Sequence, residues 1–261
     1  MSAMTPQERE DAALDSLLER AAQVGPGREE SYGPHPDQII EWYAPRTSGG
    51  SPIVFVHGGF FRPTIDRAHA RLAAAILADQ LARPVVLAEY RRVSGDPDLS
   101  VTDIHAISDL LEGLGEEPAA WVGHSAGGTL VLQRAFDQVR PAVPVVALAP
   151  VVDLTSGLTE TLGEGAIMDW LGARTAAKRG RYAHLDPVRL LAEVPERLGQ
   201  VRCVHGAEDL TVPVAQSTGS GLAVDVIAGA HHYDLIDPAA AAWTEVVAAV
   251  RSAVSGEGQG S

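Results

Sequence analysis

Short apolar runs separated by segments of helical spacing constrain the fold of this chain more than any other feature. Runs rich in Val, Ile and Leu occupy residues 39–43, 52–57, 84–90, 119–123, 143–149, 200–205 and 223–227. Between them, residues 66–81, 100–111, 126–139 and 238–254 carry apolar side chains at the spacing of one helix face. Strands that are apolar at consecutive positions are buried on both faces, and the helices provide that cover. The pattern predicts an α/β fold: a doubly wound, predominantly parallel sheet of about eight strands with right-handed crossovers.

The chain ends are expected to add a helix and a disordered tail to a single domain spanning residues 1–261. A length of 261 residues suits one such domain. Thr5-Pro6-Gln7-Glu8 combines a cap residue, a first-turn proline and a carboxylate, which predicts a helix over 6–23. Glycines and prolines then favour an extended connection over 24–37, and the Gly/Ser-rich residues 255–261 are expected to be disordered. Ser100-x-x-Asp103 is expected to cap the helix at 100–111.

Charge and cysteine content argue against several classes of partner and location. The net charge of −14 comes from scattered acidic residues, and such a surface repels nucleic-acid phosphates and anionic membranes. No run of eighteen apolar residues occurs, and the first ten residues lack the pattern of a secretory signal. The single cysteine, Cys203, excludes an intramolecular disulfide. We therefore expect a cytoplasmic protein that acts on a small molecule; its oligomeric state is not predicted.

Gly123-His124-Ser125-Ala126-Gly127 joins a predicted strand to a predicted helix. In that context G-x-S-x-G is the pattern of a nucleophile elbow, in which the serine occupies a strained turn and the flanking glycines let the backbone approach closely. The pattern alone is weak, because a chance match in this length is roughly a one-in-seven event, but both flanks agree with it here. We predict that Ser125 is a nucleophile; the alternative is a structural serine in a glycine-rich turn.

His57-Gly58-Gly59-Phe60 follows an earlier strand, where a nucleophile elbow would find its second oxyanion donor. Backbone N–H groups fixed in advance stabilise a tetrahedral oxyanion without reorganising. We expect these donors to come from Gly59, with Phe60 as the alternative in the same loop, and from Ala126 beside the serine. His57 is predicted to fix the loop by bonding to the backbone rather than to take part in the chemistry.

Asp209 and His232 are the predicted acid and base. Asp209 follows the strand at 200–205 and His232 follows the strand at 223–227, so the order is serine, acid, histidine. Asp153, after an earlier strand, and Glu208 are alternative acids. His231 is an alternative base that sequence alone does not exclude.

A metal or cofactor is not expected. His231, His232 and Asp234 lie close together in the sequence, but adjacent histidines point apart and no clear third ligand set is visible. We therefore predict no metal and no cofactor, and a small ester or amide substrate as the partner.

Residues 151–186 interrupt the regular alternation and are predicted to form a short cap over a pocket. This segment is rich in glycine yet carries a small apolar cluster, which suits a cap; the alternative is a surface excursion that covers a sheet edge. Arg62 is expected either to line the pocket or to lie on the surface. The residues predicted to contact substrate are Phe60, Phe61, His124, Met168 and Trp170.

Together these segments resemble the kynurenine formamidase-like branch of the α/β hydrolases, which is close to the esterases of the hormone-sensitive-lipase type. The resemblance runs from about Pro52 to Trp243, with 57–59 and 123–127 as its strongest motifs. It implies the α/β-hydrolase fold and hydrolysis. It also selects His232 over His231 as the base and makes Asp234 structural. The chain departs from the family pattern in having Phe61 where Trp is usual, and His231 where Gly is usual.

The predicted function is that of a serine hydrolase that cleaves a small carboxylic ester or aryl formamide through an acyl-enzyme on Ser125. Alternatives are a kynurenine formamidase proper and a non-enzymatic small-molecule receptor that retains the three residues. A peptidase usually needs more than this cap to bind an extended chain. Arg91 and Arg92 are candidates to bind a substrate carboxylate, with a surface position as the favoured alternative.

Overall fold

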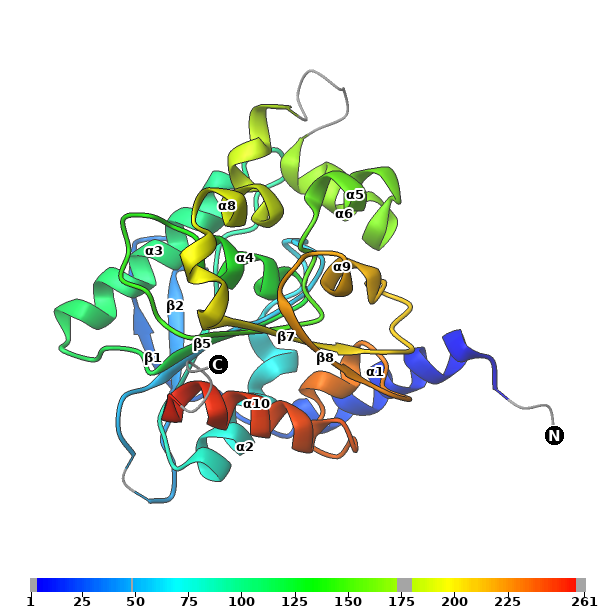
Figure 1. Cartoon of the computed structure of the whole chain (residues 1–261). Coiled ribbons are helices and arrows are strands. Elements are labelled where there is room, and N and C mark those ends of the chain that lie inside the picture. Colours follow the sequence, from blue (N-terminus) through cyan, green and yellow to red (C-terminus); the bar gives the residue numbers. More distant parts are fainter. Residues whose placement is uncertain (1–3, 48, 173–179, 257–261) are drawn as a thin grey trace.

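An eight-stranded sheet forms the centre of the computed structural model, which describes residues 4–47, 49–172 and 180–256. The strand order is β1-β2-β4-β3-β5-β6-β7-β8 (Figure 1). β2 is antiparallel to both of its neighbours, and all other pairs are parallel. The predicted sheet is thereby confirmed. The strands are β1 (Arg28–Ser31), β2 (Ile39–Tyr43), β3 (Ile53–Val56), β4 (Val85–Ala88), β5 (Ala120–His124), β6 (Val145–Leu148), β7 (Val201–Gly206) and β8 (Ala223–Ile227).

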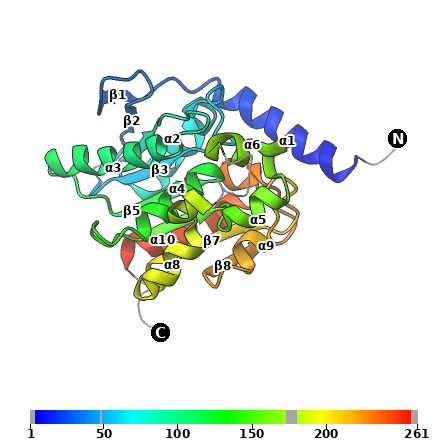
Figure 2. The ribbon, with the colours of Figure 1, turned by 90° about the horizontal axis from the view of Figure 1, so that it is seen from above.

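Helices cover both faces of the sheet (Figures 1 and 2). One face carries α1 (Pro6–Ala21), α2 (Arg71–Leu81) and α10 (Trp243–Ser255). The other carries α3 (Asp98–Gly113), α4 (Ala126–Ala135) and α8 (Pro187–Glu193). The shorter elements are η1 (Arg67–Ala70), α5 (Leu154–Thr159), α6 (Leu162–Leu171), η2 (Gly180–Leu185), η3 (Pro195–Gln200), α9 (Ala215–Thr218) and η4 (Tyr233–Ile236). None of the helices in the described ranges is long and apolar enough to cross a bilayer.

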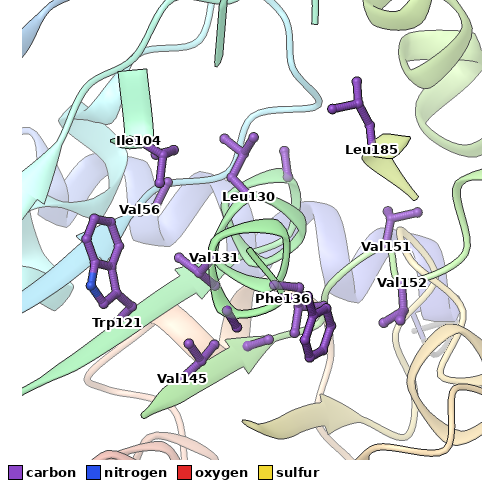
Figure 3. Packing of buried hydrophobic residues seen from close by; sticks show 14 of the residues in the cluster. Val56, Ile104, Trp121, Leu130, Val131, Phe136, Val145, Val151, Val152 and Leu185 are labelled. Carbon is purple, nitrogen blue, oxygen red and sulfur yellow. The ribbon is translucent and has the colours of Figure 1, made fainter. Parts of the chain in front are cut away.

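Two hydrophobic clusters explain why the central strands are apolar at every position. Side chains alternate across a strand, so Ile53 and Phe55 of β3 enter one cluster while Val54 and Val56 enter the other. All four are fully buried. Figure 3 shows side chains of the cluster that contains Val54 and Val56, with Leu130 and Val131 contributed by α4. Continuous apolar runs therefore reflect a sheet buried on both sides, as the sequence predicted.

Helix α1 begins where the sequence predicted. The side-chain oxygen of Thr5 accepts the backbone N–H of Glu8, and the Glu8 carboxylate accepts the N–H of Thr5. This reciprocal pair satisfies two donors at the helix start. The helix ends at Ala21, two residues before the predicted end.

The structure adds to one local prediction and corrects another. Residues 28–31, within the predicted extended connection, form the edge strand β1 and pair antiparallel with β2. Ser100 and Asp103 do not cap α3, which begins at Asp98. Both are buried within the helix and bind Arg91: Ser100 Oγ donates to its carbonyl oxygen at 2.7 Å, and the Asp103 carboxylate accepts from its guanidinium. The demands of this tertiary contact override the local capping pattern.

The chain reverses its direction of progress across the sheet between β3 and β5. β4 lies on one side of β3, whereas β5 and all later strands lie on the other. In open α/β sheets, ligands bind beyond the carboxyl ends of the strands at such a point. The loop after β3 and the turn after β5 both lie at this point. Helices α5 and α6 of the predicted cap lie on the side of the sheet that carries α4 (Figure 1). Residues 173–179 of that cap, and 257–261 of the predicted disordered tail, lie outside the described residues.

Candidate active site

Ser125 occupies a strained turn between β5 and α4. Its φ of 54° lies in a region that residues with a side chain rarely adopt, so the surrounding structure must hold it there. The two glycines of the motif allow that constraint. A Cβ on Gly123 would lie 2.3 Å from the carbonyl oxygen of Gly127, and one on Gly127 would lie 2.2 Å from that of Val56. The elbow thus packs directly against the end of β3.

We expect Gly127→Ala to destabilise the fold by about 2–3 kcal/mol, because its methyl group would collide with backbone atoms that cannot move aside cheaply. Melting followed by circular dichroism should show a fall in Tm of roughly 5–10 °C. Gly113→Ala is the matched control: it lies at the end of α3 with no atom within 4 Å of the added Cβ. Equal Tm values for the two variants would contradict the close approach at the elbow.

The loop after β3 is held in an unusual conformation that leaves N–H groups free. Gly59, Phe60 and Phe61 all have positive φ values, of 119°, 56° and 53°. The N–H groups of Gly59 and Phe60 donate to no acceptor in the described part of the chain. Ala126 begins α4, so its N–H also lacks an acceptor within the helix. These are the positions that the sequence predicted for oxyanion donors.

Buried polar and charged side chains, those of His57, Glu89 and Arg92, hold this loop in place. His57 is fully buried, with Nδ1 2.5 Å from the carbonyl oxygen of Gly58 and Nε2 3.0 Å from Glu89. Glu89 also binds the Arg92 guanidinium and, at 2.9 Å, the backbone N–H of Arg67. Burial alone would raise the pKa of Glu89, but His57 and Arg92 hold it well below its ordinary value. His57 therefore contacts backbone and fixes the loop, as predicted.

Arg92 does not lie on the surface, contrary to the favoured prediction, and Arg91 is only partly exposed. Arg92 is buried, pairs with Glu89 and donates to the carbonyl oxygen of Tyr90 at 2.5 Å. Arg91 forms an ion pair with Asp103 at 2.6 Å. Both guanidinium groups are thus held by acidic residues of the protein. Sequence reasoning missed the pair between Arg91 and Asp103 because Arg91 follows β4 whereas Asp103 lies in α3.

Asp209 and His232 meet at the carboxyl end of the sheet. His232 Nδ1 lies 2.7 Å from Asp209 Oδ2, and both side chains are buried. The other carboxylate oxygen, Oδ1, accepts the backbone N–H groups of Thr211 and Val212 at 2.9 and 2.7 Å. Burial alone would raise the pKa of Asp209, but the facing His232 and His205 lower it below its ordinary value. Asp209 is therefore a fixed anion that orients the imidazole of His232.

Ser125 and His232 line one cavity, together with His124. No hydrogen bond joins the Ser125 hydroxyl to His232 among the residues that the structure describes; such bonds are often long without a substrate and tighten when one binds. His124 donates from Nε2 to the carbonyl oxygen of His232 at 3.1 Å and so helps to hold that segment. The structure thus brings the three predicted residues to one place.

Comparison with known proteins agrees with this architecture. Residues 53–249 match the model of the alpha/beta hydrolase family. The chain belongs to this family. Lipase LipV of Mycobacterium tuberculosis is 26% identical to this hydrolase over 196 residues, which cover 73% of each protein. The sequence prediction of the fold is confirmed, whereas the narrower resemblance to kynurenine formamidases stays a prediction.

Solved esterase structures share the fold of this hydrolase. An esterase from the archaeon Pyrobaculum calidifontis superposes with a TM-score of 0.68 at 17% identity, covering 98% of this chain and 95% of that one. The carboxylesterase EstE1, cloned from a metagenomic library, gives a TM-score of 0.64 at 22% identity, with 98% and 99% covered. The similarity at this identity concerns the fold.

The alternative acids and base of this hydrolase are engaged elsewhere. Asp153 caps α5, where its carboxylate accepts the N–H of Ser156 at 2.8 Å. Glu208 is half exposed and forms a long ion pair with Arg9. His231 points away from the serine, with Nδ1 3.2 Å from the carbonyl oxygen of Glu208, and Asp234 accepts the backbone N–H of His231.

Two cavities of unequal size meet at Ser125. The smaller, of about 20 Å³, includes Phe61 and Ala126 among its walls, together with residues 162, 163, 166 and 167 of α6. The larger, of about 320 Å³, contains His232 and His124. Phe60 lines both cavities. Three of the predicted contact residues, Phe60, Phe61 and His124, therefore face these cavities.

Met168 and Trp170 do not line either cavity, contrary to the prediction. Trp170 is buried behind Phe61 and stacks on it with ring centroids 3.9 Å apart, while its indole N–H donates to Ser100 Oγ. Met168 packs against the hydrophobic core. Arg62 is partly exposed and donates to the carbonyl oxygen of Gly163 in α6. These residues support the residues that line the cavities and do not line the cavities themselves.

Helix α1 forms a wall that sequence reasoning missed. Leu14 and Leu18 line the larger cavity, whereas Leu17, on the same apolar stripe, is fully buried in the core. Glu10, also buried, accepts the backbone N–H of Leu210 at 3.0 Å and the hydroxyl of Thr211. The sequence places Leu14, Leu17 and Leu18 on one face of the predicted helix. It does not show which part of the molecule that face contacts.

Proposed function

We propose that this protein is a serine esterase with Ser125 as nucleophile, His232 as general base and Asp209 as the acid that orients the base. One observation carries the proposal: a serine on a strained elbow shares a cavity with a histidine whose Nδ1 lies 2.7 Å from a buried carboxylate. That arrangement can remove the serine proton and stabilise the resulting imidazolium. The family match and the lipase relative support ester hydrolysis.

The reaction would proceed through an acyl-enzyme. Ser125 Oγ attacks the carbonyl carbon while its proton passes to Nε2 of His232. The oxyanion accepts hydrogen bonds from the N–H of Ala126 and from that of Gly59 or Phe60, none of which has a competing acceptor among residues 4–47, 49–172 and 180–256. His232 then protonates the departing alcohol, and water releases the acyl group by the reverse path.

The two cavities support a proposal for which side each part of the substrate occupies. The leaving group must lie near His232 to receive its proton, and His232 belongs to the larger cavity. The acyl group then occupies the smaller cavity, whose volume of about 20 Å³ accommodates about one or two heavy atoms. We therefore propose short acyl groups as substrates, with α6 of the predicted cap closing this side.

We expect kcat/KM to fall by about 10²-fold or more from p-nitrophenyl acetate to p-nitrophenyl octanoate, because the longer chain exceeds the smaller cavity. Initial rates of p-nitrophenol release, with Ser125→Ala protein as the blank, measure this directly. A flat or rising series would place the acyl group in the larger cavity. Absence of any turnover above the blank would sink the esterase proposal.

Aryl formamide hydrolysis is the second candidate, favoured by the same small cavity, which suits a formyl group. Two features argue for slower turnover of N-formylkynurenine than of p-nitrophenyl acetate. Phe61 replaces an indole, and Arg91 and Arg92 are paired with Asp103 and Glu89 rather than free to bind a substrate carboxylate. Measuring kcat/KM for both substrates, by p-nitrophenol release for the ester and by the absorbance of the kynurenine formed for the formamide, decides between the candidates. A cytoplasmic location stays a prediction.

A further inference from the structure

The larger cavity is lined by both apolar and polar side chains. Leu14 and Leu18 of α1 contribute apolar groups, whereas Thr64, Asp66 and His69, in and before η1, contribute polar ones. If the proposed function is right, this space of about 320 Å³ holds the leaving group. Its chemistry should then reveal which leaving groups it prefers.

The charge of the lining residues is negative. Asp66 is exposed at the cavity and, among the described lining residues, no Arg or Lys opposes it. The adjacent Arg67 points elsewhere, into ion pairs with Glu41 at 2.6 Å and Glu89 at 3.3 Å. Arg71 lies near Asp66, but its guanidinium is paired with Glu41 at 2.7 Å. An anionic leaving group would therefore face the Asp66 carboxylate with no cation among the described lining residues, which costs free energy even across water.

His69 adds a hydrogen-bond acceptor to the same wall. Its Nδ1 lies 2.8 Å from the carbonyl oxygen of Asp66, which can only accept, so Nδ1 carries the hydrogen. Burial, assisted by the neighbouring His57, lowers the pKa of His69 to about 4, and the ring is therefore neutral near pH 7. Nε2 is then an acceptor, and it has no hydrogen-bond partner in the described ranges.

We propose that this cavity selects leaving groups that are neutral or cationic and carry a hydrogen-bond donor, with Asp66 and His69 as the specificity-determining residues. The proposal rests on the proposed esterase function. It concerns which alcohols or phenols depart, not the acyl group.

Four phenyl acetates test it, with methyl, hydroxymethyl, aminomethyl or carboxymethyl groups in the para position. The methylene spacer keeps the acidity of the four phenols similar, so differences in kcat/KM report binding rather than leaving-group strength. We expect the carboxymethyl substrate to be slower than the aminomethyl one by about tenfold. Asp66→Asn, which keeps the capping contact to Ala68, should reduce that ratio by about threefold. Glu112→Gln, an exposed charge on α3 that lines neither cavity, should leave it unchanged.

His69 is tested with the two neutral substrates. We expect the hydroxymethyl substrate to exceed the methyl one in kcat/KM by about threefold or more, a preference lost in His69→Leu and largely restored in His69→Gln, which retains an acceptor. Equal kcat/KM values for the charged pair in the wild type, or a preference unchanged by Asp66→Asn, would overturn the charge selection. A hydroxymethyl preference kept in His69→Leu would overturn the role of His69. Failure of all four substrates, with no labelling of Ser125 by a fluorophosphonate, would instead overturn the esterase function.

Discussion

Replacing Ser125 with alanine is expected to lower kcat on p-nitrophenyl acetate by at least about 10⁴-fold, because attack on the carbonyl loses its nucleophile. The fold should survive. Alanine adopts the same backbone region no less easily than serine, and the hydroxyl makes no hydrogen bond to the described residues that the fold would lose. The Tm of the variant should therefore lie close to that of the wild type, so that the loss of rate reports chemistry alone.

A fluorophosphonate probe gives an independent measurement. It should label the wild type at Ser125, as located by mass spectrometry of the modified peptide, and should not label the Ser125→Ala variant. Ser255→Ala, at an exposed position of α10, is the control and should be labelled like the wild type. Near-normal turnover by a folded Ser125→Ala protein would end the proposed mechanism. A labelled wild type that binds esters without turning them over would instead be a receptor.

Asp209→Asn is expected to cost about 10³–10⁴-fold in kcat, since an amide in place of the carboxylate favours the wrong tautomer of His232. The side chain keeps its shape, and one oxygen can still accept the N–H groups of Thr211 and Val212. The loss should therefore appear in kcat more than in Tm. Steady-state kinetics on p-nitrophenyl acetate, with melting measured in parallel, provides the test.

Asp153→Asn is the matched control for this substitution. Asp153 also follows a strand of the sheet, but its carboxylate caps α5, and asparagine caps a helix nearly as well. We expect less than about a tenfold change in kcat, because the tautomer of His232 is untouched. A larger loss of kcat in Asp153→Asn than in Asp209→Asn would identify Asp153 as the acid. The contact between Asp209 and His232 would then have no role in catalysis.

The sheet was predictable because its central strands are buried on both faces, and a strand buried in this way has apolar residues at consecutive positions. The edge strand β1 has no such apolar run. Its residues, Arg28 to Ser31, are mostly exposed, and only the pairing with β2 makes them a strand. Sequence patterns reveal burial, whereas hydrogen bonding along an exposed edge leaves little trace in residue choice.

In the candidate site, too, some features were predictable from the sequence and others were not. Ser125 was predictable because the elbow requires glycines at fixed spacing, and those glycines are in the sequence. The choice between His231 and His232 rested on resemblance until the structure directed one ring to Asp209 and the other to the Glu208 carbonyl. The placement of Trp170 behind Phe61 was not predictable, because periodicity does not distinguish a ring that lines a cavity from one that supports it.

The contacts of Glu10 have a consequence for how the protein is made. The carboxylate of Glu10 binds Leu210 and Thr211, which are separated from it by 200 and 201 positions. Helix α1 is therefore synthesised about 200 residues before the loop that anchors it. A single helix of 16 residues is only marginally stable in water by itself. The wall that Leu14 and Leu18 supply is therefore held in place only after residues 210 and 211 have been synthesised and folded, so a nascent chain gains its full binding pocket well after α1 has been made.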